Sequence, residues 1–154
     1  MSLFISSCKK SDRETPAHKN TFSAFLNGKE FVPRGIELAI SGSSARETRA
    51  IYIWGKALNG YELALYLYEY DGFKTSFTFS QGISSGGSYC TQDCGYIYSS
   101  VLSGSDSGEV KIISFDKTSQ KNGAVVIGTF QFEADGSAGK HSITNGHFSV
   151  LVLN

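Results

Sequence analysis

Two turn dipeptides set between apolar runs constrain the fold more than any other feature of the sequence. Asn59-Gly60 and Asp71-Gly72 each lie between segments rich in leucine, tyrosine and phenylalanine. These dipeptides favour two-residue hairpin turns, because both central positions need a positive φ. The spacing therefore predicts three consecutive antiparallel strands, with Tyr66 on the second strand opposite Phe77 on the third.

This register divides the predicted three-stranded meander into two faces. The face expected to form the core is dense in apolar side chains: Ile51, Ile53, Ala64, Tyr66, Tyr68, Tyr70, Phe73, Phe77 and Phe79. The other face carries Tyr52, Trp54, Leu63, Leu65 and Leu67, and it is too apolar to be freely solvated. A one-residue bulge near Asn59 would instead place Tyr52 and Trp54 on the face opposite the three leucines.

Tyr52 and Trp54 therefore have two interpretations. In the first, other strands or the segment from Cys90 to Cys94 cover them, and Trp54 is part of the core. In the second, they belong to an open aromatic platform that binds a sugar or a peptide. We expect the first arrangement, and we retain Tyr52 and Trp54 as the candidate binding face.

The rest of the chain continues the β pattern. Asn27-Gly28 predicts a hairpin whose second arm, Lys29 to Val32, ends at Pro33. Further alternating runs lie at residues 36–40, 110–115, 124–134 and 147–153. Gly128 interrupts one of them and is a predicted bulge or point of close approach. Roughly nine or ten strands and no helical period predict an all-β fold, an antiparallel sandwich or flattened barrel.

Length and charge narrow the class of partner. The chain has 154 residues, which fits one domain with a single core. Lysine plus arginine and aspartate plus glutamate number 14 each. The chain therefore lacks the basic excess that a phosphate backbone requires, and we predict no nucleic-acid partner.

The N-terminal residues carry a localisation signal. Phe4-Ile5-Ser6-Ser7-Cys8 resembles the lipobox at which bacterial lipoproteins are cleaved and acylated, with Ile5 where leucine is usual. Residues 1–7 are too short for a complete signal segment, and an ordinary disordered start is the alternative. Residues 9–20 are polar and charged, which is typical of a flexible spacer. We predict a signal remnant at 1–8, a spacer at 9–20 and one β domain at 21–154.

Acylation of Cys8 would make the membrane a partner. Outside the first residues, the sequence has no segment apolar and long enough to span a bilayer, so anchoring would depend on acyl chains alone. The predicted location is the cell envelope, lipid-anchored on the periplasmic side or at the cell surface.

Cys90 and Cys94 form a close pair in a glycine-rich segment, 86–95, that we expect to be a loop. Outside the cytoplasm this pair is expected to form a disulfide. A zinc site would need four ligands, and only Asp93 lies nearby. A catalytic dithiol would need a helix start or a basic neighbour to lower a thiol pKa, and neither is present in the sequence around the pair.

Residues typical of catalysis are few. His18 lies in the spacer, and His141 and His147 lie near the last strands without a nearby cysteine, serine elbow or second histidine at metal spacing. Glu133 and Asp135 are close carboxylates, as glycoside hydrolysis requires, but carboxylates beside glycine turns are common. We predict no catalytic residue, no metal and no cofactor. A cleft that gathered Glu133, Asp135 and His141 would instead indicate a hydrolase.

Three segments bracket most of the chain and resemble a known family. Residues 22–31, 127–132 and 143–148 read FSAFLNGKEF, IGTFQF and ITNGHF. They look like signature segments of small Bacteroidota lipoproteins classed as domains of unknown function. The resemblance implies an envelope location and a β fold, and it supplies no activity and no functional residue.

Three classes of function follow from these features. The favoured one is a non-catalytic envelope lipoprotein that binds a glycan or a protein. A structural or accessory envelope subunit without a small ligand is the alternative, and a hydrolytic enzyme comes last. An exposed platform at Tyr52 and Trp54 would favour a glycan, whereas a large exposed apolar patch without a cleft would favour a protein partner.

Overall fold

The computed structural model describes residues 18–42, 49–70, 75–79, 85–91, 97–99, 108–116, 123–136 and 139–153. These residues form β-strands and no helix. The strands are β1 (Thr21–Leu26), β2 (Lys29–Phe31), β3 (Gly35–Gly42), β4 (Arg49–Lys56), β5 (Glu62–Tyr70), β6 (Ser76–Phe79), β7 (Gly86–Cys90), β8 (Ile97–Ser99), β9 (Gly108–Asp116), β10 (Gly123–Gly136) and β11 (Gly139–Leu153). A search of the described ranges finds no helix that could cross a membrane.

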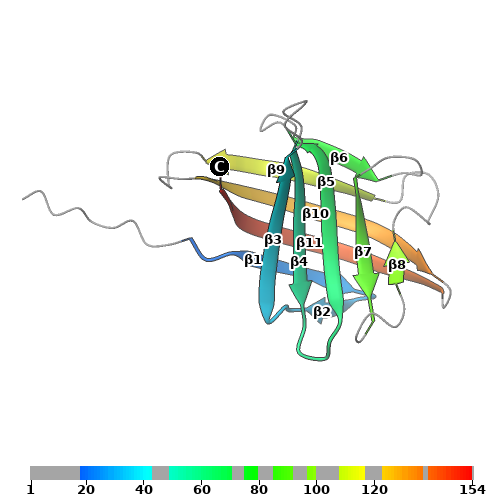
Figure 1. Ribbon diagram of the computed structural model, residues 1–154. Coiled ribbons are helices and arrows are strands. Elements are labelled where there is room, and N and C mark those ends of the chain that lie inside the picture. Colours follow the sequence, from blue (N-terminus) through cyan, green and yellow to red (C-terminus); the bar gives the residue numbers. More distant parts are fainter. Residues whose placement is uncertain are drawn as a thin grey trace, which may run out of the picture.

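The strands form two antiparallel sheets packed face to face (Figure 1). The first sheet has the order β3-β4-β5-β7-β8, and the second has the order β2-β1-β11-β10-β9-β6. One residue pair, Asp135 of β10 with Ser99 of β8, joins the two sheets. Figure 1 shows the strands of one sheet crossing those of the other steeply, as in orthogonal sandwiches. The predicted all-β antiparallel architecture is confirmed, and the described residues form eleven strands where nine or ten were expected.

The inner faces of both sheets supply one continuous core. Its largest fully buried side chains are Phe77, Phe79, Phe148, Ile51, Ile53, Leu63, Leu65, Leu67, Ile143, Val110, Val126 and Val150. Phenylalanine rings hold the second sheet together, since Phe22 stacks on Phe130 with 5.1 Å between ring centroids. Phe79 then meets Phe132 edge to face at 5.7 Å.

The predicted hairpin at Asn27-Gly28 is confirmed. Both residues have positive φ, 48° and 77°, and Leu26 pairs with Lys29 across a two-residue turn. This is the geometry that asparagine followed by glycine favours. Gly128 also behaves as predicted, because the pairing of β10 with β9 shifts register next to it and a Cβ there would lie 2.4 Å from the Phe148 ring.

The turn at Asn59-Gly60 holds three residues rather than the predicted two. The backbone N–H of Ala57 donates to the Tyr61 carbonyl at 2.8 Å, and that of Gly60 donates to the Ala57 carbonyl at 3.0 Å. Gly60 has a φ of 79°. These bonds define a type I turn followed by a left-handed bulge residue, which is the common three-residue hairpin loop.

The extra turn residue moves β5 by one position against β4 and changes which side chains reach the core. Leu63, Leu65 and Leu67 are buried beside Ile51 and Ile53. Ala64, Tyr66 and Tyr68 lie on the opposite face, so their predicted place in the core is wrong. The side chain of Tyr70 lies outside the described part of the structure. The bulge alternative noted for Asn59 describes the structure. Phe73, also assigned to the core, lies outside the described residues.

The third strand of the predicted meander pairs elsewhere. Tyr66 pairs with Gly86 of β7 rather than with Phe77, so β7 takes the place next to β5. Phe77 pairs with Val110 of β9 in the second sheet. The prediction was wrong because the chain crosses between the sheets after β5, which buries Phe77 and Phe79 in the core. Residues 71–74, including the Asp71-Gly72 turn, lie outside the described ranges.

The glycine-rich segment predicted as a loop begins with a strand. Gly86–Cys90 is β7, which pairs with β5 on one side and with β8 on the other. Its glycines make room for the second sheet, because a Cβ on Gly87 would lie 2.4 Å from two atoms of the Phe132 ring. The glycine content therefore serves close sheet packing rather than a turn.

We predict that Gly87→Ala destabilises the domain. The added methyl group must displace the Phe132 ring or the backbone of β7, which costs about 1–3 kcal/mol. Chemical denaturation of the purified protein measures this loss. Gly35→Ala is the matched control, since a Cβ at Gly35 meets nothing within 4 Å. Equal stability of the two variants would show that Phe132 does not constrain β7.

Candidate functional site

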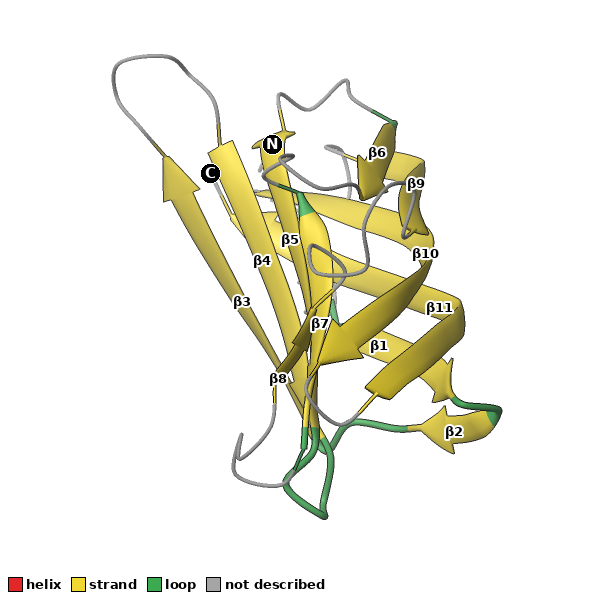
Figure 2. Ribbon diagram, turned by 90° about the vertical axis from the view of Figure 1, so that its right-hand side faces the viewer, coloured by secondary structure: helices red, strands yellow, loops and turns green. Residues whose placement is uncertain are grey.

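The outer face of the first sheet carries a cluster of aromatic side chains that we call the aromatic face: Tyr52, Trp54, Tyr66 and Tyr68. Strand alternation places them there, because Ile51, Ile53, Leu65 and Leu67 take the inward positions of the same strands. All four aromatic side chains are partly exposed. In the views of Figures 1 and 2, no described strand lies over this side of β4 and β5.

Polar partners fix the aromatic side chains. Trp54 donates its Nε1–H to the Glu37 carboxylate at 3.0 Å. A 2.9 Å hydrogen bond joins the hydroxyls of Tyr66 and Ser88. The Tyr52 ring meets that of Tyr66 edge to face, with 5.7 Å between centroids. The polar group of each ring is thus anchored, which limits the conformational entropy lost on binding.

Small residues lie beside Trp54 and Tyr66 on one side of each ring. Trp54 pairs with Ala64, which pairs with Ser88, and Tyr66 pairs with Gly86. Directly paired side chains lie on the same face of a sheet, so one side of the Trp54 ring and one side of the Tyr66 ring adjoin residues with small side chains. A flat ligand could therefore contact the sides of these rings as well as their polar edges.

A hollow borders the aromatic face at the end where β3 begins. It has a volume of about 580 Å³ and is lined by Arg34, Gly35, Glu37, Lys56, Ala57, Leu58, Asn59 and Gly60. Glu37 belongs to both features, since the carboxylate that lines the hollow also accepts the Trp54 indole N–H. The hollow therefore places charged and amide side chains beside the aromatic rings. Its volume lies within the usual range for ligand sites.

The expectation that Trp54 belongs to the core is not met. Neither Tyr52 nor Trp54 is among the buried residues of the core cluster, and both side chains lie on the outer face. The Asn59-Gly60 dipeptide fits both a two-residue turn and a three-residue loop, and the three-residue loop places the leucines on the face opposite Trp54. Tyr66, Tyr68 and Glu37 were missed as members of the face.

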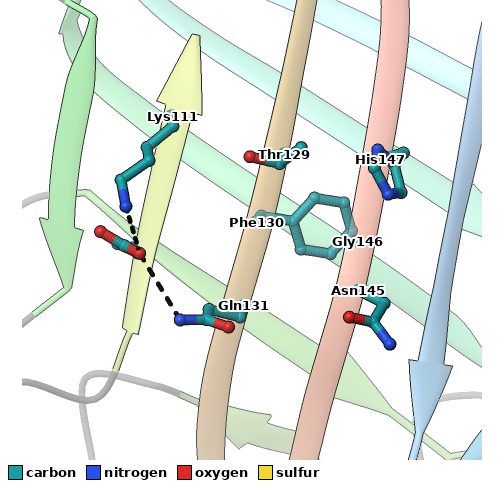
Figure 3. A pocket seen from close by; sticks show the side chains of 8 residues that line it. Lys111, Thr129, Phe130, Gln131, Asn145, Gly146 and His147 are labelled. Atoms are coloured by element: carbon teal, nitrogen blue, oxygen red, sulfur yellow. Dashed lines mark hydrogen bonds and ion pairs between the residues drawn. The ribbon is translucent and has the colours of Figure 1, made fainter. Parts of the chain in front are cut away.

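A second and smaller hollow lies on the outer face of the second sheet (Figure 3). It has a volume of about 240 Å³ and is lined by Glu109, Lys111, Thr129, Phe130, Gln131, Asn145, Gly146 and His147. Lys111 lies 2.8 Å from the Glu109 carboxylate, which neutralises it. The volume falls below the usual range for ligand pockets, so we do not place the main site here.

The carboxylates considered for catalysis do not gather with a histidine. Ala134, which pairs with His141, is fully buried, so His141 lies on the inner side of the β10–β11 ribbon. Glu133 alternates to the outer side, where it forms an ion pair with Lys140 at 3.0 Å. Within the described ranges, no three histidine, cysteine or acidic side chains form a group that could hold a metal ion.

The cysteines are only partly described. Cys90 is buried at the end of β7. Cys8 and Cys94 lie outside the described residues, so acylation of Cys8 and a Cys90–Cys94 disulfide stay predictions.

No family model, curated protein or solved structure matches the chain. The resemblance to small Bacteroidota lipoproteins therefore stays a prediction.

The Tyr52–Tyr68 contact predicts an alkaline titration. A 2.9 Å hydrogen bond joins the two hydroxyls. This bond, and then partial burial, raise the pKa of Tyr68 above its ordinary value of 10.0. Because the folded-state pKa is raised, the stability that the Tyr68 hydroxyl contributes is present below pH 10.0 and lost as pH rises through the folded-state value.

We expect Tyr52→Phe to lower the pKa of Tyr68 toward its ordinary value, because the hydrogen bond is its main cause. Ultraviolet absorbance of tyrosinate, recorded across an alkaline titration, measures the change. Tyr61→Phe is the control, since Tyr61 stacks on Tyr89 away from this contact. An unchanged Tyr68 titration in Tyr52→Phe would contradict the hydrogen bond.

Proposed function

We propose that this protein is a lipid-anchored envelope protein whose β-sandwich binds a glycan, without catalysis, through the aromatic face and the hollow beside it. The observation that carries the proposal is the partial exposure of Tyr52, Trp54, Tyr66 and Tyr68 on one outer sheet face. Sugar rings present C–H groups on one side and hydroxyls at the edge. Tyrosine and tryptophan suit both, since each combines an apolar ring with a polar group.

The neighbouring hollow supports a glycan as the ligand. Arg34, Glu37, Lys56 and Asn59 line it and offer both hydrogen-bond donors and acceptors, as sugar hydroxyls require. A continuous site would therefore have ring surface at Trp54 and polar groups beside it. Glu37 would connect the two, because it already orients the indole.

A protein partner is less well supported on this face. Standard protein interfaces bury roughly 800 Å² on each partner around an apolar centre. The large apolar residues that are most exposed in the described chain are Phe25, Val32, Leu58, Ile113 and Ile127. None of them belongs to the aromatic face, whose ring surface is interrupted by hydroxyl and carboxylate groups.

Anchoring would hold this domain at the envelope through Cys8 and the polar segment 9–20. The last residues of that segment are already held to the domain, because the Asn20 side chain accepts the backbone N–H of Leu151 at 2.9 Å and His18 lies 3.2 Å from the Ser149 hydroxyl. The chain is thus attached to β11 just before β1 begins.

We predict that Trp54→Ala reduces glycan binding at least tenfold, a loss of about 1.4 kcal/mol, because it removes the largest ring of the face. Affinity electrophoresis in gels that contain laminarin, xylan or soluble starch, together with sedimentation with peptidoglycan, gives the measurement. Phe25→Ala is the matched control, since Phe25 is an aromatic residue 39% exposed on the second sheet. Retardation of the parent protein by none of these glycans, or equal loss in both variants, would refute the glycan proposal.

Anchoring has a separate test. In a chain that carries a complete signal segment, Cys8→Ser should release the protein from membranes, because acyl chains are the proposed anchor. Fractionation of cells followed by immunoblotting measures the release, and Ser7→Ala is the control. Retention of the Cys8→Ser variant in the membrane fraction would refute lipid anchoring and leave the glycan site untouched.

A further inference from the structure

A third concave region, which we call the end cleft, lies between two hairpin turns at one end of the sandwich. The turn at Asn27-Gly28 and the loop at Leu58–Gly60 form its two sides, near the end of the molecule where Figure 2 shows β2 and the β4–β5 turn. The cleft has a volume of about 640 Å³, within the usual range for small-molecule sites. It contains none of the four rings of the aromatic face, and it shares Ala57, Leu58 and Asn59 with the hollow beside that face.

One part of this end cleft is apolar. Phe31, Tyr61 and Tyr89 line it, and the Tyr61 ring stacks on that of Tyr89 with 5.8 Å between centroids. Val32 and Leu58 also line it, with 61% and 75% of their surfaces exposed. Two such exposed aliphatic side chains beside one aromatic wall are typical of a surface that an apolar group covers.

Another part of the cleft is polar and held in one arrangement. The Asn27 Oδ1 accepts the backbone N–H of Ser142 at 2.9 Å, which fixes the orientation of the amide. The Asn27 Nδ2 therefore donates to His141 Nδ1, at 2.8 Å. Asn27 and His141 both line the cleft, and the Asn27 Nδ2 group carries a second hydrogen with which it can donate to a ligand.

Lys29 and Glu30 of β2 both border the cleft, from opposite faces of the strand. Lys29 and Phe31 share a face of this strand, and Phe31 pairs with buried Ala24. Glu30 pairs with the exposed Phe25 and so projects from the opposite face, although it borders the cleft. In the described part of the chain, no carboxylate forms an ion pair with Lys29.

We propose that the end cleft is a binding site for a small amphipathic carboxylate, next to the glycan site and distinct from its aromatic rings. The apolar body of the ligand packs against Tyr61, Phe31 and Val32. Its carboxylate lies toward Lys29, which supplies charge, and toward the Asn27 Nδ2 group, which donates a hydrogen bond to it. The apolar body is a flat ring or a short acyl chain. Binding of indole-3-acetate would indicate the ring, and binding of octanoate would indicate the acyl chain.

Amide NMR spectra of the full chain, titrated with indole-3-acetate and separately with octanoate, test the proposal. Each acid is compared with its neutral amide, indole-3-acetamide or octanamide. We expect at least one acid to shift the Asn27 side-chain amide and the backbone signals of Tyr61 and His141. We also expect that acid to bind about tenfold tighter than its amide, since Lys29 has no described partner to neutralise it.

Two variants test whether the carboxylate and the apolar body bind at the residues named above. Lys29→Met should abolish the preference for the acid over the amide, and Val32→Ser should weaken both probes. Ile113→Ser is the matched control for Val32→Ser, since Ile113 is β-branched, 65% exposed and on β9, outside the cleft. Equal binding of acid and amide, shifts centred elsewhere, or no binding by either acid at millimolar concentration would each overturn the proposal.

The test is independent of the glycan proposal. Trp54→Ala should leave carboxylate binding unchanged, and Lys29→Met should leave retardation by glycans unchanged. Loss of carboxylate binding in Trp54→Ala would show that the two sites are one, and it would also overturn the proposal of a distinct carboxylate site in the end cleft.

Discussion

Three phenylalanine rings pack where glycine has no side chain, and the rest of the structure depends on these contacts. Phe132 fills the space above Gly87 of the opposite sheet, while Phe130 and Phe148 cover Gly146 and Gly128 on neighbouring strands. In each case a Cβ on the glycine would lie within 2.4–2.5 Å of the ring. The contact of Phe132 with Gly87 sets how closely the two sheets approach at β7. The outer face of the first sheet, with its aromatic residues, is positioned by this packing.

Asparagine-glycine pairs show how one local signal gives different structures. At Asn27-Gly28 both residues have positive φ and form a two-residue turn. At Asn59-Gly60 the glycine closes a three-residue loop. At Asn145-Gly146 the asparagine, with a φ of 49°, forms a bulge inside β11 opposite β10. The dipeptide permits left-handed backbone in all three places, and the strands around it decide how that freedom is used.

The two proposed sites use different parts of this framework. The aromatic face is built on strand positions, where the pleat holds Trp54 and Tyr66 and hydrogen bonds to Glu37 and Ser88 fix them. The end cleft is built on turns, and its polar part is ordered by Asn27, whose side chain bridges β1 and β11. A rigid sheet surface suits an extended chain of sugars, whereas a cleft between turns suits a small molecule. The hollow beside Glu37 borders both features, since Ala57, Leu58 and Asn59 also line the end cleft.

The sequence by itself determined the class of fold, the turn at Asn27-Gly28 and the close approach at Gly128, because these follow from local backbone chemistry and the period-two pattern. It also singled out Tyr52 and Trp54. The tertiary structure decided that Trp54 lies outside the core and that β7 rather than β6 pairs with β5. A one-residue change in turn length reverses every side chain of a strand, and the choice of partner strand depends on contacts far apart in the sequence. Neither is encoded in the local pattern, so packing of the two sheets against each other selected both.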